Sequence, residues 1–179
     1  FDQSAHRDNT IIVLWSDHGY AFGEKDHFAK NTLWERSTHV PFIMAVPGVT
    51  TPGSRSRRPV DLTCLYPTLT RLCGLPVPGG LDGVDITPLL KDPDLPWKQP
   101  AIIDFLSGNT AVRTEDWSYI RYKEGRAGEE LYNLKNDPEE WRNLIGKFPE
   151  KANELKAWFP GSYADAVPAK KAYHFNEKT

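Results

Sequence analysis

The chain carries, near its N-terminus, a group of residues that could bind a metal ion. An apolar run, Ile11–Trp15, ends shortly before Asp17, His18 and Gly19. A continuous run of bulky residues is typical of a strand buried on both faces of a parallel sheet, and ligands bind just beyond the carboxyl ends of such strands. Asp17 offers carboxylate oxygen and His18 imidazole nitrogen, while Gly19 lets the backbone turn tightly. We therefore expect Asp17 and His18 to form part of a metal site.

Lys30 follows the polar loop after this group and could bind an anion, because its ammonium is a compact positive charge with three donors. A plainer alternative is that Asp17 caps a helix, His18 is a polar loop residue and Lys30 is a solvated surface charge. Because three-residue matches are common, the Asp-His-Gly triplet alone favours that alternative.

Longer blocks of sequence around these residues favour the first interpretation, a site for a metal ion and an anion. The chain reads W-S-D-H-G, G-E-K-D-H-F-A-K, T-H-V-P-F-I-M-A-V-P-G, V-D-L-T-C-L-Y-P-T-L-T-R-L-C-G and G-E-E-L-Y-N-L-K-N-D-P-E-E-W-R-N-L. Together these blocks resemble the C-terminal portion of a type I (formylglycine-dependent) sulfatase of the alkaline phosphatase superfamily. The resemblance is nearest to the iduronate-2-sulfatase-like branch, and the blocks span most of residues 10–145 in the family's order.

Residues 1–95 are expected to be the C-terminal part of the sulfatase catalytic α/β domain. Alternating strand and helix patterns favour a mostly parallel sheet covered on both faces, as in the alkaline-phosphatase-like sandwich that the resemblance implies. The segment 41–47 reads as a second buried strand. Asp61 can then cap a helix that Gly74 ends, and Pro67 inside that pattern indicates a kink or a later start.

Residues 96–179 are expected to be a small antiparallel C-terminal subdomain. Four short strand candidates are separated by turn residues, which indicates a sheet of hairpins: Ala101–Leu106, Thr110–Arg113, Trp117–Lys123 and Glu130–Leu134. Glu150–Phe159 has the apolar spacing of an amphipathic helix that packs on this sheet.

The resemblance also implies a chemistry, the hydrolysis of sulfuric esters. Type I sulfatases attack sulfur with a formylglycine made in a C-x-P-x-R motif, while a calcium ion and basic residues hold the sulfate. By resemblance, Asp17 and His18 are metal ligands of one Ca²⁺, Lys30 is the catalytic residue that binds sulfate and stabilises the leaving oxygen, and His27 lies near the substrate. Because calcium prefers oxygen ligands, Asp17 is the firmer ligand, and the alternatives for His18 are a place beside the ion or a bond to the sulfate.

No nucleophile is expected in this chain. Cys64 and Cys73 each have proline three residues later rather than two, and neither has the arginine of the motif. The nucleophile and the remaining calcium ligands would therefore come from the missing N-terminal half of the catalytic domain, either a second chain or simply absent. The chain by itself is expected to be catalytically inactive.

Composition narrows the classes of function. A formal net charge of −2 gives no basic surface for nucleic acid, and no apolar run approaches the roughly 18 residues of a membrane span. The resemblance implies glycan degradation, with a sulfated glycan as substrate, and an extracytoplasmic location (periplasmic, secreted or lysosomal). Two alternatives stay open: a phosphoesterase of the same superfamily, and a non-catalytic carbohydrate-binding or structural module.

Overall fold

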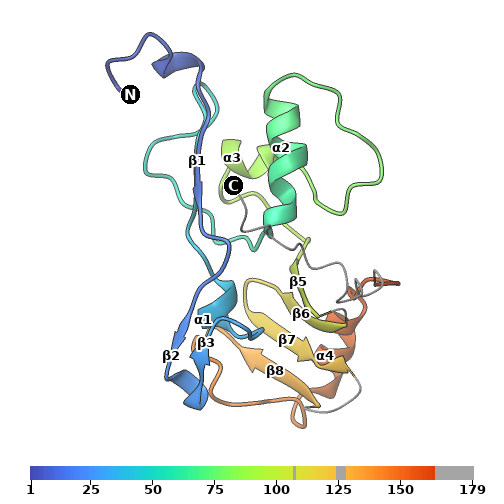
Figure 1. Ribbon diagram of the computed structural model, residues 1–179. Helices are drawn as coiled ribbons and strands as arrows, with labels where there is room; N and C mark the ends of the chain where they lie inside the picture. Colours follow the sequence, from blue (N-terminus) through green and yellow to red (C-terminus); the bar gives the residue numbers. More distant parts are fainter. Residues whose placement is uncertain (107, 124–127, 164–179) are drawn as a thin grey trace, which may run out of the picture.

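The computed structural model describes residues 1–106, 108–123 and 128–163, and its helices and strands lie in two parts (Figure 1). One part holds a strand pair beside two helices: β1 (Ile12–Trp15), β4 (Phe42–Ala45), α2 (Leu65–Leu72) and α3 (Thr87–Lys91). The other is a sheet with order β5-β6-β7-β8, formed by Ala101–Phe105, Asn109–Arg113, Trp117–Arg121 and Glu129–Asn133, with α4 (Pro149–Lys156) against it. The connection between β1 and β4 carries β2 (Ala21–Phe22), β3 (Phe28–Ala29) and α1 (Glu35–Thr38), and single 3-10 turns span Arg7–Asn9, Glu24–Asp26 and Leu62–Cys64.

The first strand pair differs from the expected mostly parallel sheet in its direction. β1 and β4 are antiparallel, with Ile12 opposite Ala45 and Trp15 opposite Phe42, because the chain returns from the intervening loop beside the strand that it left. All strand pairs in the described ranges are antiparallel. The burial expected for the first strand is also not found within this chain, since Leu14 and Trp15 are 57% and 49% exposed.

The helix expected after Asp61 is confirmed. Asp61 Oδ1 accepts a hydrogen bond from the Thr63 backbone N–H at 3.1 Å and so caps the first turn. The α-helical part begins only at Leu65, which places Pro67 in its first turn, where its missing N–H costs nothing. Gly74 ends the helix with φ of +69°, and its N–H donates to the carbonyl of Arg71 at 3.0 Å.

The antiparallel subdomain is confirmed as a sheet of consecutive hairpins with a helix on one face. Val112, Tyr119 and Leu131 point to that face and form a core with Ala152 and Leu155 of α4. The alternate residues of the same strands point to the opposite face, as the two-residue period of a strand requires.

That opposite face is covered by the loop between β1 and β4. Leu33, which is 2% exposed, packs there with Ala111, Ile120, Tyr132 and Leu134. The loop that carries the candidate anion-binding lysine is thus attached to the sheet of the C-terminal subdomain. The division at residues 95 and 96 stays a prediction.

Of the helices in the described ranges, none has the length and apolar character needed to cross a bilayer.

We expect Asp61→Ala to lower the free energy of unfolding by about 1–2 kcal/mol, the usual cost of losing a helix N-cap. The carboxylate joins the two parts of the molecule, since its second oxygen accepts from the Ile102 N–H of β5 at 3.2 Å. Asp61→Asn keeps one acceptor oxygen and should lose less. Urea unfolding followed by circular dichroism measures both, with the exposed Asp2→Ala as control. An unchanged midpoint for Asp61→Ala would contradict the capping role.

Candidate metal and anion site

Three of the residues expected to do chemistry converge in the structure. Asp17 and His18 follow the end of β1, and Lys30 follows β3. Lys30 Nζ lies 2.8 Å from His18 Nε2, and Asp17 Oδ2 lies 3.7 Å from the same nitrogen. The loop thus brings a carboxylate, an imidazole and an ammonium group together. Their roles in binding stay predictions.

The hydrogen bonds of His18 determine its tautomer. Nδ1 lies 2.7 Å from the carbonyl oxygen of Gly19, which can only accept, so Nδ1 carries the proton. In the neutral ring Nε2 then has a free lone pair, which accepts from the Lys30 ammonium. This is also the tautomer that ligates a metal through Nε2, with the other ring nitrogen held by a backbone carbonyl.

Asp17 and His18 fit two neighbouring positions on a calcium ion. Two ligand atoms about 2.4 Å from the ion and at a right angle are roughly 3.4 Å apart, close to the observed 3.7 Å. The side chain of Asp17 is 82% exposed, so its oxygens are accessible. The single lone pair of His18 Nε2 serves either the ion or Lys30, which makes Asp17 the firmer ligand.

The described residues around Asp17 and His18 do not supply the further ligands that a calcium ion needs. Within the described ranges there is no group of three His, Cys, Asp or Glu side chains that could hold a metal ion. The residues present therefore fit part of a calcium site.

Backbone contacts hold the turn that carries Asp17 and His18. The Gly19 N–H donates to the carbonyl of Ser37 in α1 at 2.9 Å. A Cβ on Gly19 would lie 2.1 Å from the carbonyl oxygen of Arg36, so the chain passes α1 too closely for any side chain. The Ser16 hydroxyl donates to the His18 carbonyl at 2.8 Å and closes the turn.

His27 is not among the converging side chains. Its ring meets Trp34 edge-on, with ring centroids 6.1 Å apart. Its Nε2 is buried and has no hydrogen-bond partner among the described residues. The expected contact between His27 and substrate stays a prediction.

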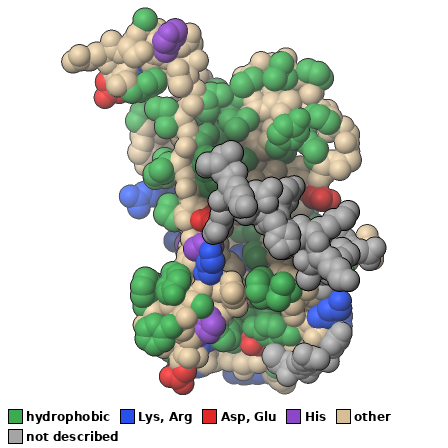
Figure 2. Space-filling view, in the orientation of Figure 1, with side chains coloured by type: hydrophobic (Ala, Val, Ile, Leu, Met, Phe, Trp, Pro, Cys, Tyr) green, Lys and Arg blue, Asp and Glu red, His purple; other side chains and the backbone are tan. Residues whose placement is uncertain are grey.

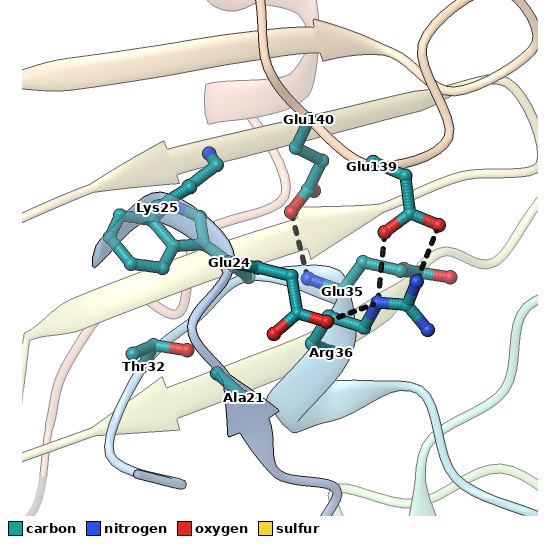
Figure 3. A pocket seen from close by; sticks show the side chains of 9 residues that line it. Ala21, Glu24, Lys25, Thr32, Glu35, Arg36, Glu139 and Glu140 are labelled. Atoms are coloured by element: carbon teal, nitrogen blue, oxygen red, sulfur yellow. Dashed lines mark hydrogen bonds and ion pairs between the residues drawn. The ribbon is translucent and has the colours of Figure 1, made fainter. Parts of the chain in front are cut away.

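A pocket lies between the β1–β4 loop, which carries α1, and the segment after β8 that holds Glu139 and Glu140 (Figure 3). It is lined by Ala21, Glu24, Lys25, Thr32, Trp34, Glu35, Arg36, Glu139 and Glu140. Lys25 places its ammonium over the rings of Trp34 and Tyr132, at 4.4 and 4.3 Å from their centroids. Burial lowers the pKa of Lys25, although nearby carboxylates oppose this.

Glu139 and Glu140 of this pocket were not singled out from the sequence. Glu139 and Glu140 lie in the block that ends D-P-E-E-W-R-N-L, far along the chain from Glu35 and Arg36. The position of Glu139 and Glu140 within that block was a signal available in the sequence. Only the folded chain shows that these two residues contact α1.

Cys64 does not have the environment of a nucleophile. Cys64 is buried, and burial raises the pKa of its thiol to about 12. Cys73 is exposed, and both thiols are free. Low-pKa thiols beside positive charge are the reactive ones, so the buried Cys64 thiol is suited to packing, with Ile86 and Leu89.

Hydrophobic side chains gather on one face over the β2–β3 hairpin, next to the site (Figure 2). Tyr20, Phe22 and Phe28 are 45%, 73% and 72% exposed, and the rings of Tyr20 and Phe22 are 5.0 Å apart. The converging polar groups thus stand beside an apolar surface.

Comparison with known proteins yields a consistent set of relatives. The family model described as N-sulphoglucosamine sulphohydrolase, C-terminal, matches residues 23–158, a range that includes Lys30 and begins after His18. A sulfatase of Formosa agariphila is 37% identical over 163 residues, which are 90% of this chain and 32% of that protein. Arylsulfatase K of Homo sapiens is 33% identical over 157 residues, which are 79% of this chain and 28% of that protein.

Solved structures include proteins with a similar fold. A protein solved in complex with its substrate D-glucosamine-2-N,6-O-disulfate has a TM-score of 0.77 and 28% identity, covering 86% of this chain and 34% of that one. The expected fold class, the C-terminal part of the alkaline-phosphatase-like α/β fold, is confirmed. The chain spans about a third of the length of these relatives.

We expect Gly19→Ala to destabilise the turn by about 1–3 kcal/mol, the usual cost of overpacking, because the new methyl group would overlap the Arg36 carbonyl. Thermal unfolding measures the loss. Gly79→Ala is the matched control, since nothing lies within 4 Å of its Cβ position. Equal melting temperatures for the two variants would show that the close approach is not a constraint.

The Glu35–His39 pair predicts a weak pH dependence of stability. Glu35 Oε1 lies 2.6 Å from His39 Nδ1 and raises the pKa of His39. Burial alone would raise the pKa of Glu35, but hydrogen bonds from His39 and the charge of Arg113 outweigh it and lower that pKa.

The contribution of His39 to stability is present in full below about pH 6.5, where the unfolded histidine is also protonated. It is lost as the pH rises through the raised pKa of the folded state. Because the His39 side chain is 73% exposed, the loss should be only about 0.3–0.5 kcal/mol. Urea unfolding between pH 6 and 9 measures it, and His39→Asn should remove it. A loss of the same size in His39→Asn would assign the pH dependence to other groups.

Proposed function

The chain belongs to the N-sulphoglucosamine sulphohydrolase C-terminal family, and we propose that it forms the C-terminal part of a sulfatase that hydrolyses sulfate esters of glycans. The observation that carries the proposal is the meeting of Lys30 with His18 beside Asp17, at the end of β1. A cation next to a partial calcium site suits a substrate group with negative charge on several oxygens.

The residues of the chain have distinct tasks in this proposal. The Lys30 ammonium binds a sulfate oxygen and opposes the negative charge that develops on the leaving oxygen, which is where a fixed positive group accelerates the reaction most. Asp17 and His18 would hold a calcium ion through a carboxylate oxygen and Nε2. The ion, when bound, supplies further positive charge toward the sulfate oxygens.

His18 links the two tasks. In the described chain its Nε2 accepts from Lys30, and the backbone carbonyl of Gly19 fixes the ring. That one lone pair would serve either a calcium ion or the Lys30 ammonium, so the same ring nitrogen bears on both tasks.

The rest of the machinery is proposed to lie outside this chain. The formylglycine nucleophile and the remaining calcium ligands would come from an N-terminal half, in keeping with relatives about three times as long. The substrate is proposed to be a sulfated glycan, which the glucosamine disulfate bound to a similar structure supports. An extracytoplasmic location is part of the same proposal.

The proposal is tested by assaying aryl sulfate hydrolysis by the chain alone and with the polypeptide that carries C-x-P-x-R, with and without calcium. We expect no turnover by the chain alone and calcium-dependent turnover by the assembled protein. Lys30→Ala in the assembled protein should lower kcat by about 10²–10³-fold, the usual effect of losing one charge-stabilising group. Lys135→Ala, an exposed lysine on the C-terminal subdomain, is the control.

Other outcomes point to other functions. Turnover by the chain alone would contradict the need for a second part. A preference for aryl phosphate over aryl sulfate would favour a phosphoesterase of the same superfamily. Glycan binding without turnover of either ester by the assembled protein would favour a carbohydrate-binding module.

A further inference from the structure

We infer that Glu140 of the C-terminal subdomain is a positioning residue for the Asp17–His18 turn, acting through α1. The inference deepens the proposed function, on which its catalytic consequence rests. Glu140 touches none of the converging side chains; its effect passes through backbone contacts that link the subdomain to the turn.

The first link joins Glu140 to the start of α1. Glu140 Oε2 accepts a hydrogen bond from the Glu35 backbone N–H at 2.7 Å, drawn in Figure 3. The first N–H groups of a helix have no partner within the helix, and Trp34, which precedes α1, makes no side-chain cap. Glu140 therefore caps α1 from a distant part of the chain.

The Glu140 carboxylate that makes this cap has little freedom to move. Glu140 is 1% exposed and has φ of +59°, a backbone conformation that residues other than glycine rarely adopt. Burial raises the pKa of Glu140, and the hydrogen bond from the Glu35 N–H, together with the Arg113 guanidinium 4.0 Å from Oε1, opposes this. Oε1 has no hydrogen-bond partner among the described residues. A buried carboxylate with one strong acceptor contact is oriented by that contact.

The second link holds the side chain of Glu35. Its Oε2 is paired with Arg113 of β6 and its Oε1 with His39. Arg36, the next residue, pairs with Glu139 at 2.8 Å and with Glu24 at 3.5 Å. Thus α1 is fastened to the sheet subdomain at its first two residues. A four-residue helix is too short to be stable on its own, so these contacts determine where it lies.

The third link joins α1 to both halves of the site. The Ser37 carbonyl accepts from the Gly19 N–H at 2.9 Å, next to His18. The Ser37 hydroxyl accepts from Thr32 Oγ1 at 2.8 Å, and the Thr32 N–H donates to the Lys30 carbonyl at 2.9 Å. One helical turn therefore sets the distance between the metal-ligand pair and the lysine.

The test is amide hydrogen exchange and ring ¹⁵N NMR on the full 179-residue chain. We expect Glu140→Ala to lower the protection of the Gly19 amide at least 10-fold and to shift the His18 ring resonances. The Val112 and Ile120 amides in β6 and β7 should stay within threefold of wild type. Glu140→Gln keeps an acceptor oxygen and should leave Gly19 within threefold of wild type. Glu129→Ala, an acid of β8 that pairs with Lys156 instead, is the control.

Unchanged protection of Gly19 in Glu140→Ala would overturn the inference. Equal loss at Gly19, Val112 and Ile120 would also overturn it, because Glu140 would then serve folding in general. If Glu140→Ala does not fold, Glu140→Asp replaces it, since the shorter side chain withdraws the carboxylate from the Glu35 N–H and keeps the negative charge. Selective loss at Gly19 in Glu140→Asp supports the inference, and no loss contradicts it.

A second measurement gives the catalytic consequence. In the assembled protein, Glu140→Ala should lower kcat on aryl sulfate about 10-fold with little change in KM, and Glu140→Gln should restore most of it. If the wild-type assembly has no sulfatase activity, the proposed function fails, while the exchange data still decide the positioning role. If the wild type is active and Glu140→Ala equals it, the positioning role fails alone.

Discussion

The contact between Gly19 and α1 is the constraint on which the candidate site depends. A missing side chain lets the backbone after His18 approach the Arg36 carbonyl, and one hydrogen bond to Ser37 holds it there. Because α1 is in turn fastened to the sheet subdomain, the Asp17–His18 pair takes its position from residues more than a hundred positions later in the chain. The C-terminal subdomain thus helps to hold the candidate site in position.

Around this contact, the charged groups that are expected to bind ligands differ in exposure from the charged groups that support them. The groups expected to bind ligands are accessible, and Asp17 is 82% exposed. Among the supporting groups, Glu140 is buried, and Glu35 and Arg113, which pair with each other, are only 16% and 23% exposed. Accessible charges are free to exchange water for an ion or a sulfate, whereas buried paired charges lose much by moving. The arrangement separates binding from positioning, which is what a site assembled from two parts of a protein requires.

Local patterns predicted much of the fold. Alternation and turn residues identified the strands of the C-terminal sheet to within a few residues, and Asp61 and Gly74 marked the helix ends, because capping and turn chemistry act between near neighbours. The direction of the β1–β4 pair was not predictable in this way. An apolar run indicates a strand but does not specify its neighbour, and the exposure of Leu14 depends on what else covers the sheet.

For the site, the sequence by itself determined which chemistry is available: Asp17, His18 and Lys30 lie on one loop, and the surrounding blocks resemble a sulfatase. Residue types and short spacings are enough for that, since the loop joins them covalently. Only the tertiary structure decided that His18 Nε2 accepts from Lys30, that His27 turns to Trp34, and that Glu140 caps α1. The first two contacts depend on how the loop folds, and the third joins residues 105 positions apart, which only the packing of the loop on the sheet brings within hydrogen-bond distance.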